Sequence, residues 1–205
     1  MDNFLLHRNF TIPHQVNRTY FGINWDMIPG PMVESSTGTV QQVVTTHVGK
    51  GDPSGAEWTE AGVAKFLNGV PQYFTYDSDQ GTWMFPSLTT SPSSLNNYEI
   101  YVSNTKDANG YYIYYTYINN QFVRTGHLYY RQTQFNMVTE VWANGNNPFT
   151  SDNGIYFEYP YLFDSTGYQD WGNYQETSTT PDSDKPPYDT YWMNGGSWEV
   201  NCWVP

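Results

Sequence analysis

The stretch from Tyr98 to Asn147 constrains the fold more than any other part of this sequence, because it holds four strand-like runs separated by short turn sequences. The separators are TKDANG, NNQ and TQ, which are typical of a β-meander. Aromatic residues favour strands, and Phe, Trp and Tyr make up 19% of this 205-residue chain. The sequence therefore predicts an all-β protein.

The rest of the chain extends this pattern in both directions. Strand-like runs also occur at residues 18–28, 40–49 and 72–77, and a closing strand is predicted at Ser197 to Val204. The sequence contains no repeat and no linker. It predicts a two-sheet antiparallel β-sandwich over residues 1–205 as a single domain, with residues 1–18 as an N-terminal arm or edge strand.

The run GYYIYYTYI, residues 110–118, has apolar side chains in both phases of the strand alternation. Such a strand is either buried on both faces, or covered by the core on one face and part of an aromatic-lined groove on the other. A polar loop is expected at residues 86–97, PSLTTSPSSLNN.

The segment EWTEAGVAKF, residues 57–66, has helix-forming residues but lies between predicted strands. We expect it to be a strand, with Trp58, Glu60 and Gly62 on one face. A second strand, QFNMVTEVWANG, puts Glu140 and Trp142 on a shared face in the same way. Each glutamate thus has a tryptophan two residues away, and a tryptophan wall that excludes water raises the pKa of a carboxyl group. The alternative is that each glutamate is a solvent-facing strand residue.

Composition excludes several classes of function. The formal net charge of -12, from 8 Lys and Arg against 20 Asp and Glu, argues against nucleic-acid and anionic-membrane partners. The excess of carboxylates favours an acidic working environment. Cys202 is the one cysteine, so no disulfide can form within the chain, and no zinc motif or other metal or cofactor site is predicted.

Other titratable residues have simpler interpretations. No GxSxG motif accompanies the four histidines, and His47 and His127 are expected to be ordinary sheet residues. Asp77 and Asp79 are expected to form a turn, because no glutamate follows at the spacing of a calcium loop.

The order of these segments resembles the neprosin family of glutamic peptidases, over roughly residues 20–160. The resemblance is carried by an apolar strand, then the Glu-Ala-Gly step at Glu60, then the aromatic strand QYFTYD, and later MVTEVW. Plant members carry cysteines and a WWL-like strand that are missing here, so a divergent relative is the better description. The same sandwich occurs in eqolisin-type peptidases, which pair a glutamate with a glutamine.

The resemblance implies a concanavalin-like jelly roll and an acid-active glutamic endopeptidase without a cofactor. Glu60 and Glu140 match the two catalytic glutamates, which would lie within about 6 Å and share a proton. A family preference for cleavage after proline implies an apolar, aromatic subsite, for which the candidates are Trp58, Tyr73, Tyr130 and Trp142. Gly62 is expected to leave space beside Glu60 for a substrate backbone.

The expected partner is a polypeptide substrate of a secreted, monomeric protein. The alternative is a carbohydrate-binding or glycan-cleaving protein on the same lectin-like sandwich, because aromatic-lined sheets also stack on sugar rings and paired carboxyls cleave glycosides. A third alternative is a protein that keeps the fold without catalysis.

Overall fold

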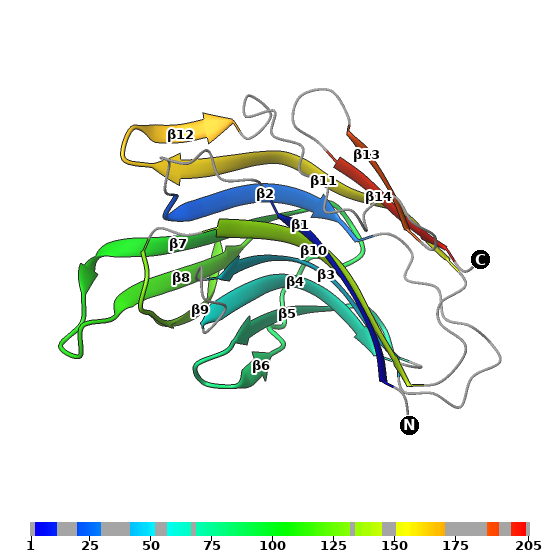
Figure 1. The fold of residues 1–205 in the computed structure, drawn as a ribbon, viewed down its shortest axis with the longest axis horizontal. Helices are drawn as coiled ribbons and strands as arrows, with labels where there is room; N and C mark the ends of the chain where they lie inside the picture. Colours follow the sequence, from blue (N-terminus) through cyan, green and yellow to red (C-terminus); the bar gives the residue numbers. More distant parts are fainter. Residues whose placement is uncertain are drawn as a thin grey trace.

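The computed structural model consists of strands arranged in two sheets (Figure 1). It describes residues 3–11, 20–29, 42–51, 57–66, 69–131, 134–144, 151–170, 188–192 and 198–203. Side chains are described for residues 20–29, 45, 49, 57–66, 69–131, 135, 156, 158 and 161–167. Among these residues, no helix is long and apolar enough to cross a membrane.

The first sheet has six strands, and its spatial order is β1 (Asn3–Thr11), β10 (Gln134–Asn144), β3 (Gln42–Gly51), β4 (Trp58–Phe66), β5 (Gln72–Asp77) and β6 (Thr82–Met84). The segment expected at residues 57–66 is a strand from Trp58 to Phe66, as the pattern of its neighbours predicted, despite its helix-forming residues. β1 lies at the edge of this sheet, within the segment that was expected to be an arm or edge strand.

The second sheet has eight strands, in the order β13 (Tyr188–Trp192), β14 (Trp198–Trp203), β11 (Ser151–Asp164), β2 (Gly22–Ile28), β7 (Asn96–Lys106), β8 (Tyr112–Ile118) and β9 (Gln121–Leu128), with β12 (Gly167–Asp170) paired to β11. Every described ladder is antiparallel. The predicted two-sheet antiparallel β-sandwich is confirmed.

The core forms where the inward faces of the two sheets meet. In the second sheet Trp25 stacks on Tyr98, with ring centroids 5.3 Å apart, and both side chains are fully buried. Tyr73 of the first sheet meets Tyr98 at 6.4 Å between ring centroids. Burial alternates along β2 and β7, as expected for strands with one face in the core. β8 follows the same rule, because Tyr114 is buried while Tyr115 is half-buried on the other face.

The meander turns follow their sequence chemistry. Asn119 and Asn120 both have positive φ, 51° and 59°, which is the geometry of the tight turn between β8 and β9. In the turn before β8, the N–H groups of Tyr111 and Asn109 donate to the Asp107 carboxylate at 2.9 and 2.8 Å. These bonds, Tyr111 foremost, hold the pKa of Asp107 below its ordinary value.

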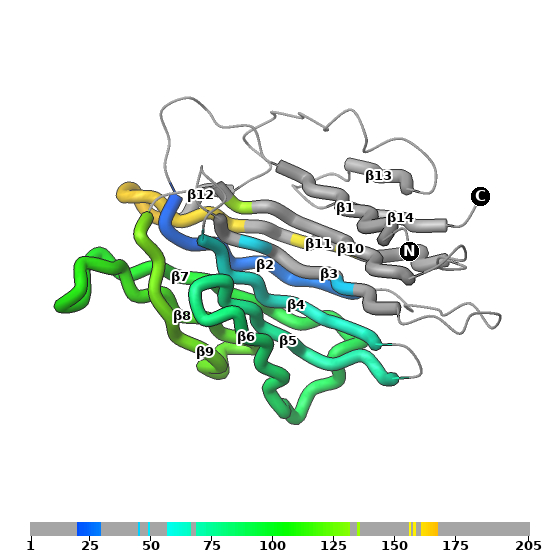
Figure 2. Tube along the Cα trace, turned by 60° about the horizontal axis from the view of Figure 1, so that its bottom comes forward, coloured from blue at the N-terminus to red at the C-terminus, as the bar shows by residue number. Residues whose placement is uncertain are grey.

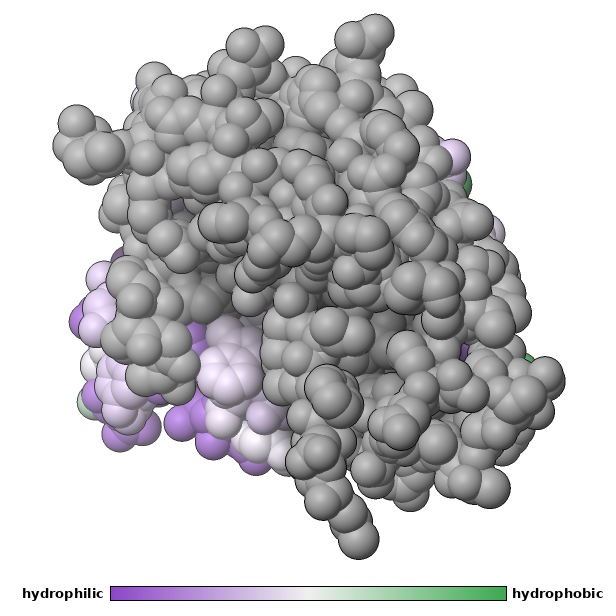
Figure 3. Space-filling model, turned by 45° about the vertical axis from the view of Figure 1, so that its right-hand side comes forward, coloured by the Kyte–Doolittle hydropathy of each residue, from purple (hydrophilic) through white to green (hydrophobic). Residues whose placement is uncertain are grey.

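In Figure 2, β4, β5 and β6 run beside β7, β8 and β9 in the described part of the chain. On the face drawn in Figure 3, the visible described residues are mostly purple to pale, so this part of the surface is polar or near neutral in hydropathy.

Candidate functional site

Glu60 lies on the outer face of the six-stranded sheet, which we define as the side turned away from the eight-stranded sheet. The other phase of β4, with Thr59, Ala61 and Val63, is completely buried against the core. Glu60 is half-buried, and its Oε1 accepts a hydrogen bond from the Trp58 indole N–H at 2.8 Å. The predicted pairing of this glutamate with the tryptophan two residues away is therefore present as a direct contact.

Strand pairing surrounds Glu60 with aromatic rings. Tyr76 of β5 is directly opposite Glu60, and Trp83 of β6 is opposite Tyr76. We call the resulting group the outer aromatic cluster, and its members are Trp58, Phe66, Phe74, Tyr76, Trp83 and Phe85. Its rings form a continuous chain, with centroids 5.8 Å apart for Trp58 and Tyr76 and 5.6 Å for Tyr76 and Trp83.

Several rings of the outer aromatic cluster are open to solvent. Trp58 is 36% exposed, Phe66 39%, Phe85 41% and Trp83 42%, which is high for side chains of this size. A row of exposed rings beside a carboxylate can hold the apolar side chains of a polypeptide or stack on sugar rings. Tyr76, Trp83 and Phe85 could not be predicted from the sequence as neighbours of Glu60, because only the pairing of β4 with β5, and of β5 with β6, brings them to this face.

Two glycines lie next to Glu60 on this face. Gly62 of β4 is buried, has the same strand phase as Glu60, and is opposite Phe74. Gly49 of β3 is directly opposite Glu60, and a Cβ at position 49 would touch the Glu60 Cγ at 3.7 Å, an ordinary contact distance. Both glycines are buried, so other residues cover the backbone at these two positions, and the space that Gly62 was expected to leave for a substrate backbone stays a prediction.

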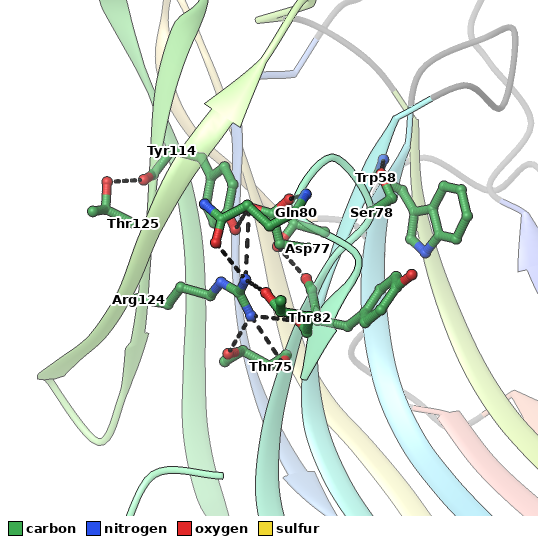
Figure 4. Close-up of polar contacts among 11 residues, drawn as sticks. Trp58, Thr75, Asp77, Ser78, Gln80, Thr82, Tyr114, Arg124 and Thr125 are labelled. Atoms are coloured by element: carbon green, nitrogen blue, oxygen red, sulfur yellow. Dashed lines mark hydrogen bonds and ion pairs between the residues drawn. The ribbon is translucent and has the colours of Figure 1, made fainter. Parts of the chain in front are cut away.

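A buried polar network positions the two strands that carry the aromatic rings. Arg124 of β9 is 3% exposed, and its guanidinium donates to the Thr82 carbonyl at 2.9 Å and to the Thr82 Oγ1 at 2.7 Å. The same guanidinium donates to the Thr75 carbonyl at 3.3 Å. Figure 4 shows this network on one side of β4 and β5 and Trp58 on the other. Arg124 thus fixes the β5–β6 hairpin from the core side, which sets the position of Tyr76 and Trp83.

Asp77 is the anion of this network. It is 1% exposed and accepts a 2.6 Å hydrogen bond from the Tyr114 hydroxyl, while Arg124 lies 3.9 Å from the same oxygen. Burial, and after it the hydrogen bond to Asp77, raises the pKa of Tyr114 well above its usual range. The Gln80 N–H donates to the other Asp77 oxygen at 3.0 Å, so the expected turn at Asp77 is present.

The register of β10 fixes the backbone position of Glu140. Glu140 pairs with Thr45 of β3, and Thr45 pairs with Ala64 of β4. Glu60 and Glu140 are therefore two strands and four residues apart in the same sheet. With regular spacings between neighbouring strands and between residues along a strand, this offset corresponds to roughly 16 Å between the two backbone positions.

The expected separation of about 6 Å between the two carboxyl groups, with one shared proton, stays a prediction, because the register places only the backbone of Glu140. The side chains of Glu140, Trp142 and His47 lie outside the described residues.

The remaining candidate residues are scattered. Tyr73 is 2% exposed, and its hydroxyl donates to Asn96 Oδ1 at 2.7 Å in the core, so it is on the opposite face from Glu60 and does not line this face beside it. Side chains alternate between the two faces along β5, and the pairing of Tyr73 with the buried Val63 of β4 places Tyr73 on the core side. Only the strand pairing reveals this. Tyr130 follows β9 of the other sheet and is 47% exposed. Trp142 pairs with Val43 and Leu5, two residues beyond Glu140 along β10. His127 lies in β9, where its Nε2 is 3.6 Å from Asp107.

The described residues contain no group of three or more His, Cys, Asp and Glu that could hold a metal ion.

No protein-family profile matches this sequence, and no curated protein matches it. The fold, by contrast, is similar to that of solved structures. Two crystal structures of scytalido-glutamic peptidase, each with a transition state analog, align with 99% of this chain and 100% of theirs. Their TM-scores are 0.55 and 0.59, at 10% and 11% sequence identity.

This chain has the fold of scytalido-glutamic peptidase. The likeness extends over the whole length of both chains, so the resemblance to the glutamic peptidase sandwich holds for the fold, whereas no family profile supports the neprosin family in particular. A β-glucanase of Bacillus licheniformis is also similar, over 71% of this chain and 73% of that chain, at 15% identity and a TM-score of 0.38.

Proposed function

We propose that this protein is a glutamic endopeptidase in which Glu60 and Glu140 activate water for peptide-bond hydrolysis. The observation that carries the proposal is the setting of Glu60. It is half-buried on an open sheet face, bonded to the Trp58 indole, and bordered by exposed aromatic rings. The whole-length likeness in fold to a glutamic peptidase supports the same function.

The contacts of Glu60 suit a general base. An N–H donor held against a carboxylate stabilises its ionised form, and the Trp58 indole supplies that donor. Glu60 would take a proton from a water molecule whose oxygen attacks the carbonyl carbon of the peptide. Glu140, in its protonated form, would then donate its proton to the leaving nitrogen as the C–N bond breaks. The products are a carboxylic acid and an amine.

This division of roles gives a pH dependence. Glu140 acts only while it holds a proton, so activity should be confined to acidic pH, where carboxyl groups titrate, and should fall as the pH rises above that range. A secreted, monomeric protein with a preference for cleavage after proline, as in the neprosin family, is part of the same proposal. The exposed rings of the outer aromatic cluster support that preference, because aromatic grooves bind proline-rich segments.

Substitution of the two glutamates tests the proposal. Glu60→Gln or Glu140→Gln should abolish the release of peptides from a denatured protein at about pH 3 to 4, where carboxyl groups titrate. Glu99→Gln is the matched control, since Glu99 is also half-buried in a strand but lies in the other sheet, and this variant should keep full activity. Circular dichroism would establish that all three variants fold. Full proteolysis by both Glu60→Gln and Glu140→Gln would refute the function.

A further inference from the structure

A pocket of about 410 Å³ opens at the start of β5, beside the outer aromatic cluster. Pro71, Gln72 and Tyr73 line one side of it, and six residues between positions 85 and 92 line the other. None of these lining residues carries a charge, and three of them are prolines. The volume lies in the range of pockets that bind small ligands, and the lining combines apolar side chains with uncharged polar ones.

Hydrogen bonds hold the wall of this pocket in place. The Tyr73 hydroxyl lies 2.7 Å from Thr90 Oγ1, and the Asn119 amide donates to the same Thr90 oxygen at 2.8 Å. The Asn96 amide donates to the carbonyls of Ser91 and Ser94 at 2.9 and 2.7 Å. The loop is therefore tied both to β5 and to the second sheet, and a ligand would bind a preformed pocket at a small cost in ordering.

Phe85 joins the pocket to the face that carries Glu60. It lines the pocket, stacks on Trp83 with ring centroids 6.1 Å apart, and meets Phe66 edge-on at 5.7 Å. Gln72, on the pocket side, is four residues from Tyr76, which is directly opposite Glu60. Four residues of regular strand span roughly 13 Å, so an extended peptide that passes Glu60 reaches the pocket with its fourth residue or a neighbouring one.

We propose that this pocket is a distal specificity site, which takes a large uncharged apolar side chain, aromatic foremost, about four residues from the scissile bond of a polypeptide. The proposal rests on the function proposed above. The lining favours an apolar side chain because prolines, Phe85 and Leu88 offer apolar contacts, and it disfavours a charged one because no lining residue can pair with it.

Binding to a variant that does not depend on cleavage tests the pocket. The probes are fluorescein-labelled decapeptides of Ala and Ser that carry one Phe, moved by one position at a time, and the protein is Glu60→Gln of the full chain. Phe at one distal position should tighten binding about tenfold over Ala at that position, in fluorescence anisotropy, because burial of an aromatic side chain is favourable. Asp at the same position should remove the gain.

Two tryptophan variants localise the effect. Leu88→Trp, combined with Glu60→Gln, places a larger side chain in the pocket, and we expect it to abolish the preference for Phe. Leu95→Trp is the matched control in the same loop, because Leu95 is 50% exposed and does not line the pocket, and it should keep the preference. Equal binding of the Phe and Ala peptides at every position, or a preference that survives Leu88→Trp, would overturn the proposal.

Cleavage separates this inference from the function on which it rests. In the wild-type protein, mass spectrometry of a digested peptide library should show aromatic residues enriched at one position three to five residues from the cut. Cleavage without such enrichment would overturn the distal site and leave the peptidase intact. Selective binding of the Phe peptide, with no cleavage by the wild-type protein, would support the pocket and refute the peptidase.

Discussion

At the scale of single residues, Glu60 and Asp77 show how position decides the role of a carboxyl group. Both lie in the paired strands β4 and β5, but on opposite faces. Asp77 is buried and held by Tyr114, Gln80 and Arg124, so it links the two sheets. Glu60 has the Trp58 indole on an open face, where a substrate can reach it.

The Tyr114 hydroxyl should contribute measurably to stability. Tyr114→Phe removes its 2.6 Å hydrogen bond to Asp77 in a buried site, and we expect the free energy of unfolding to fall by about 2 kcal/mol, as for a lost bond to a charged group. Urea denaturation measures this. Tyr115→Phe, at the next position on the half-buried face of β8, is the matched control and should change stability by less than about 0.5 kcal/mol.

Wild type and Tyr114→Phe can also be compared as the pH changes. The pKa of Tyr114 is raised in the folded state, foremost by burial, so its contribution to stability is complete below about pH 10, the pKa of an unfolded tyrosine. It is lost as the pH rises from there toward the folded-state pKa, since only the unfolded chain releases the proton. The stability difference between wild type and Tyr114→Phe should therefore shrink above about pH 10. A difference that grows with pH would contradict this assignment.

At the scale of elements, β9 supports the β5–β6 hairpin from the core side. Arg124 reaches the hairpin from β9, and two residues along the strand Gly126 lies against the pair of Asp77 and Tyr114. A Cβ at position 126 would overlap the Asp77 carboxylate and would lie 2.6 Å from the Tyr114 ring. The close approach of β9 to this network thus requires glycine at that position.

Gly126→Ala should destabilise the protein by about 1 to 3 kcal/mol, the usual cost of forcing an added methyl group into a packed site. The shift of the denaturation midpoint measures it. Gly49→Ala serves as the control, because its added Cβ would meet nothing closer than 3.7 Å. If the two variants were equally stable, Gly126 would not be the point of closest approach that the structure describes.

At the scale of the whole molecule, charge sets the response to solvent. A net charge of -12 at neutral pH means that folded carboxylates repel one another over the surface. Added salt screens this repulsion within a Debye length of about 8 to 10 Å near 0.1 M ionic strength. The protein should therefore be less stable at low salt near pH 7 than near its isoelectric point.

We expect the melting temperature at pH 7 to rise by several degrees, roughly 2 to 4 °C per kcal/mol for a chain of this size, between 0.02 and 0.5 M NaCl. Near pH 4.4, the isoelectric point of the sequence, the same change of salt should have little effect. Thermal unfolding followed by circular dichroism gives both values. A melting temperature at pH 7 that is independent of salt would show that the surface carboxylates do not repel one another appreciably.

Much of the fold was predictable from local sequence. Alternation and turn chemistry located the strands from β7 to β10 and the tight turn at Asn119 and Asn120. Strand β4 was identified against its helix-forming residues, because every neighbouring segment is a strand. The short β6, Thr82–Met84, was not predicted, since three residues carry too little periodicity.

The sequence by itself determined the all-β class and the contact of Glu60 with Trp58, because side chains two residues apart on a strand share a face. Only the tertiary structure decided which strands pair and in what register. Pairing brought Tyr76 and Trp83 to Glu60, turned Tyr73 into the core, and set Glu140 two strands and four residues away. The physical reason is that alternation is a local property of the backbone, whereas register depends on which faces of distant strands are buried together.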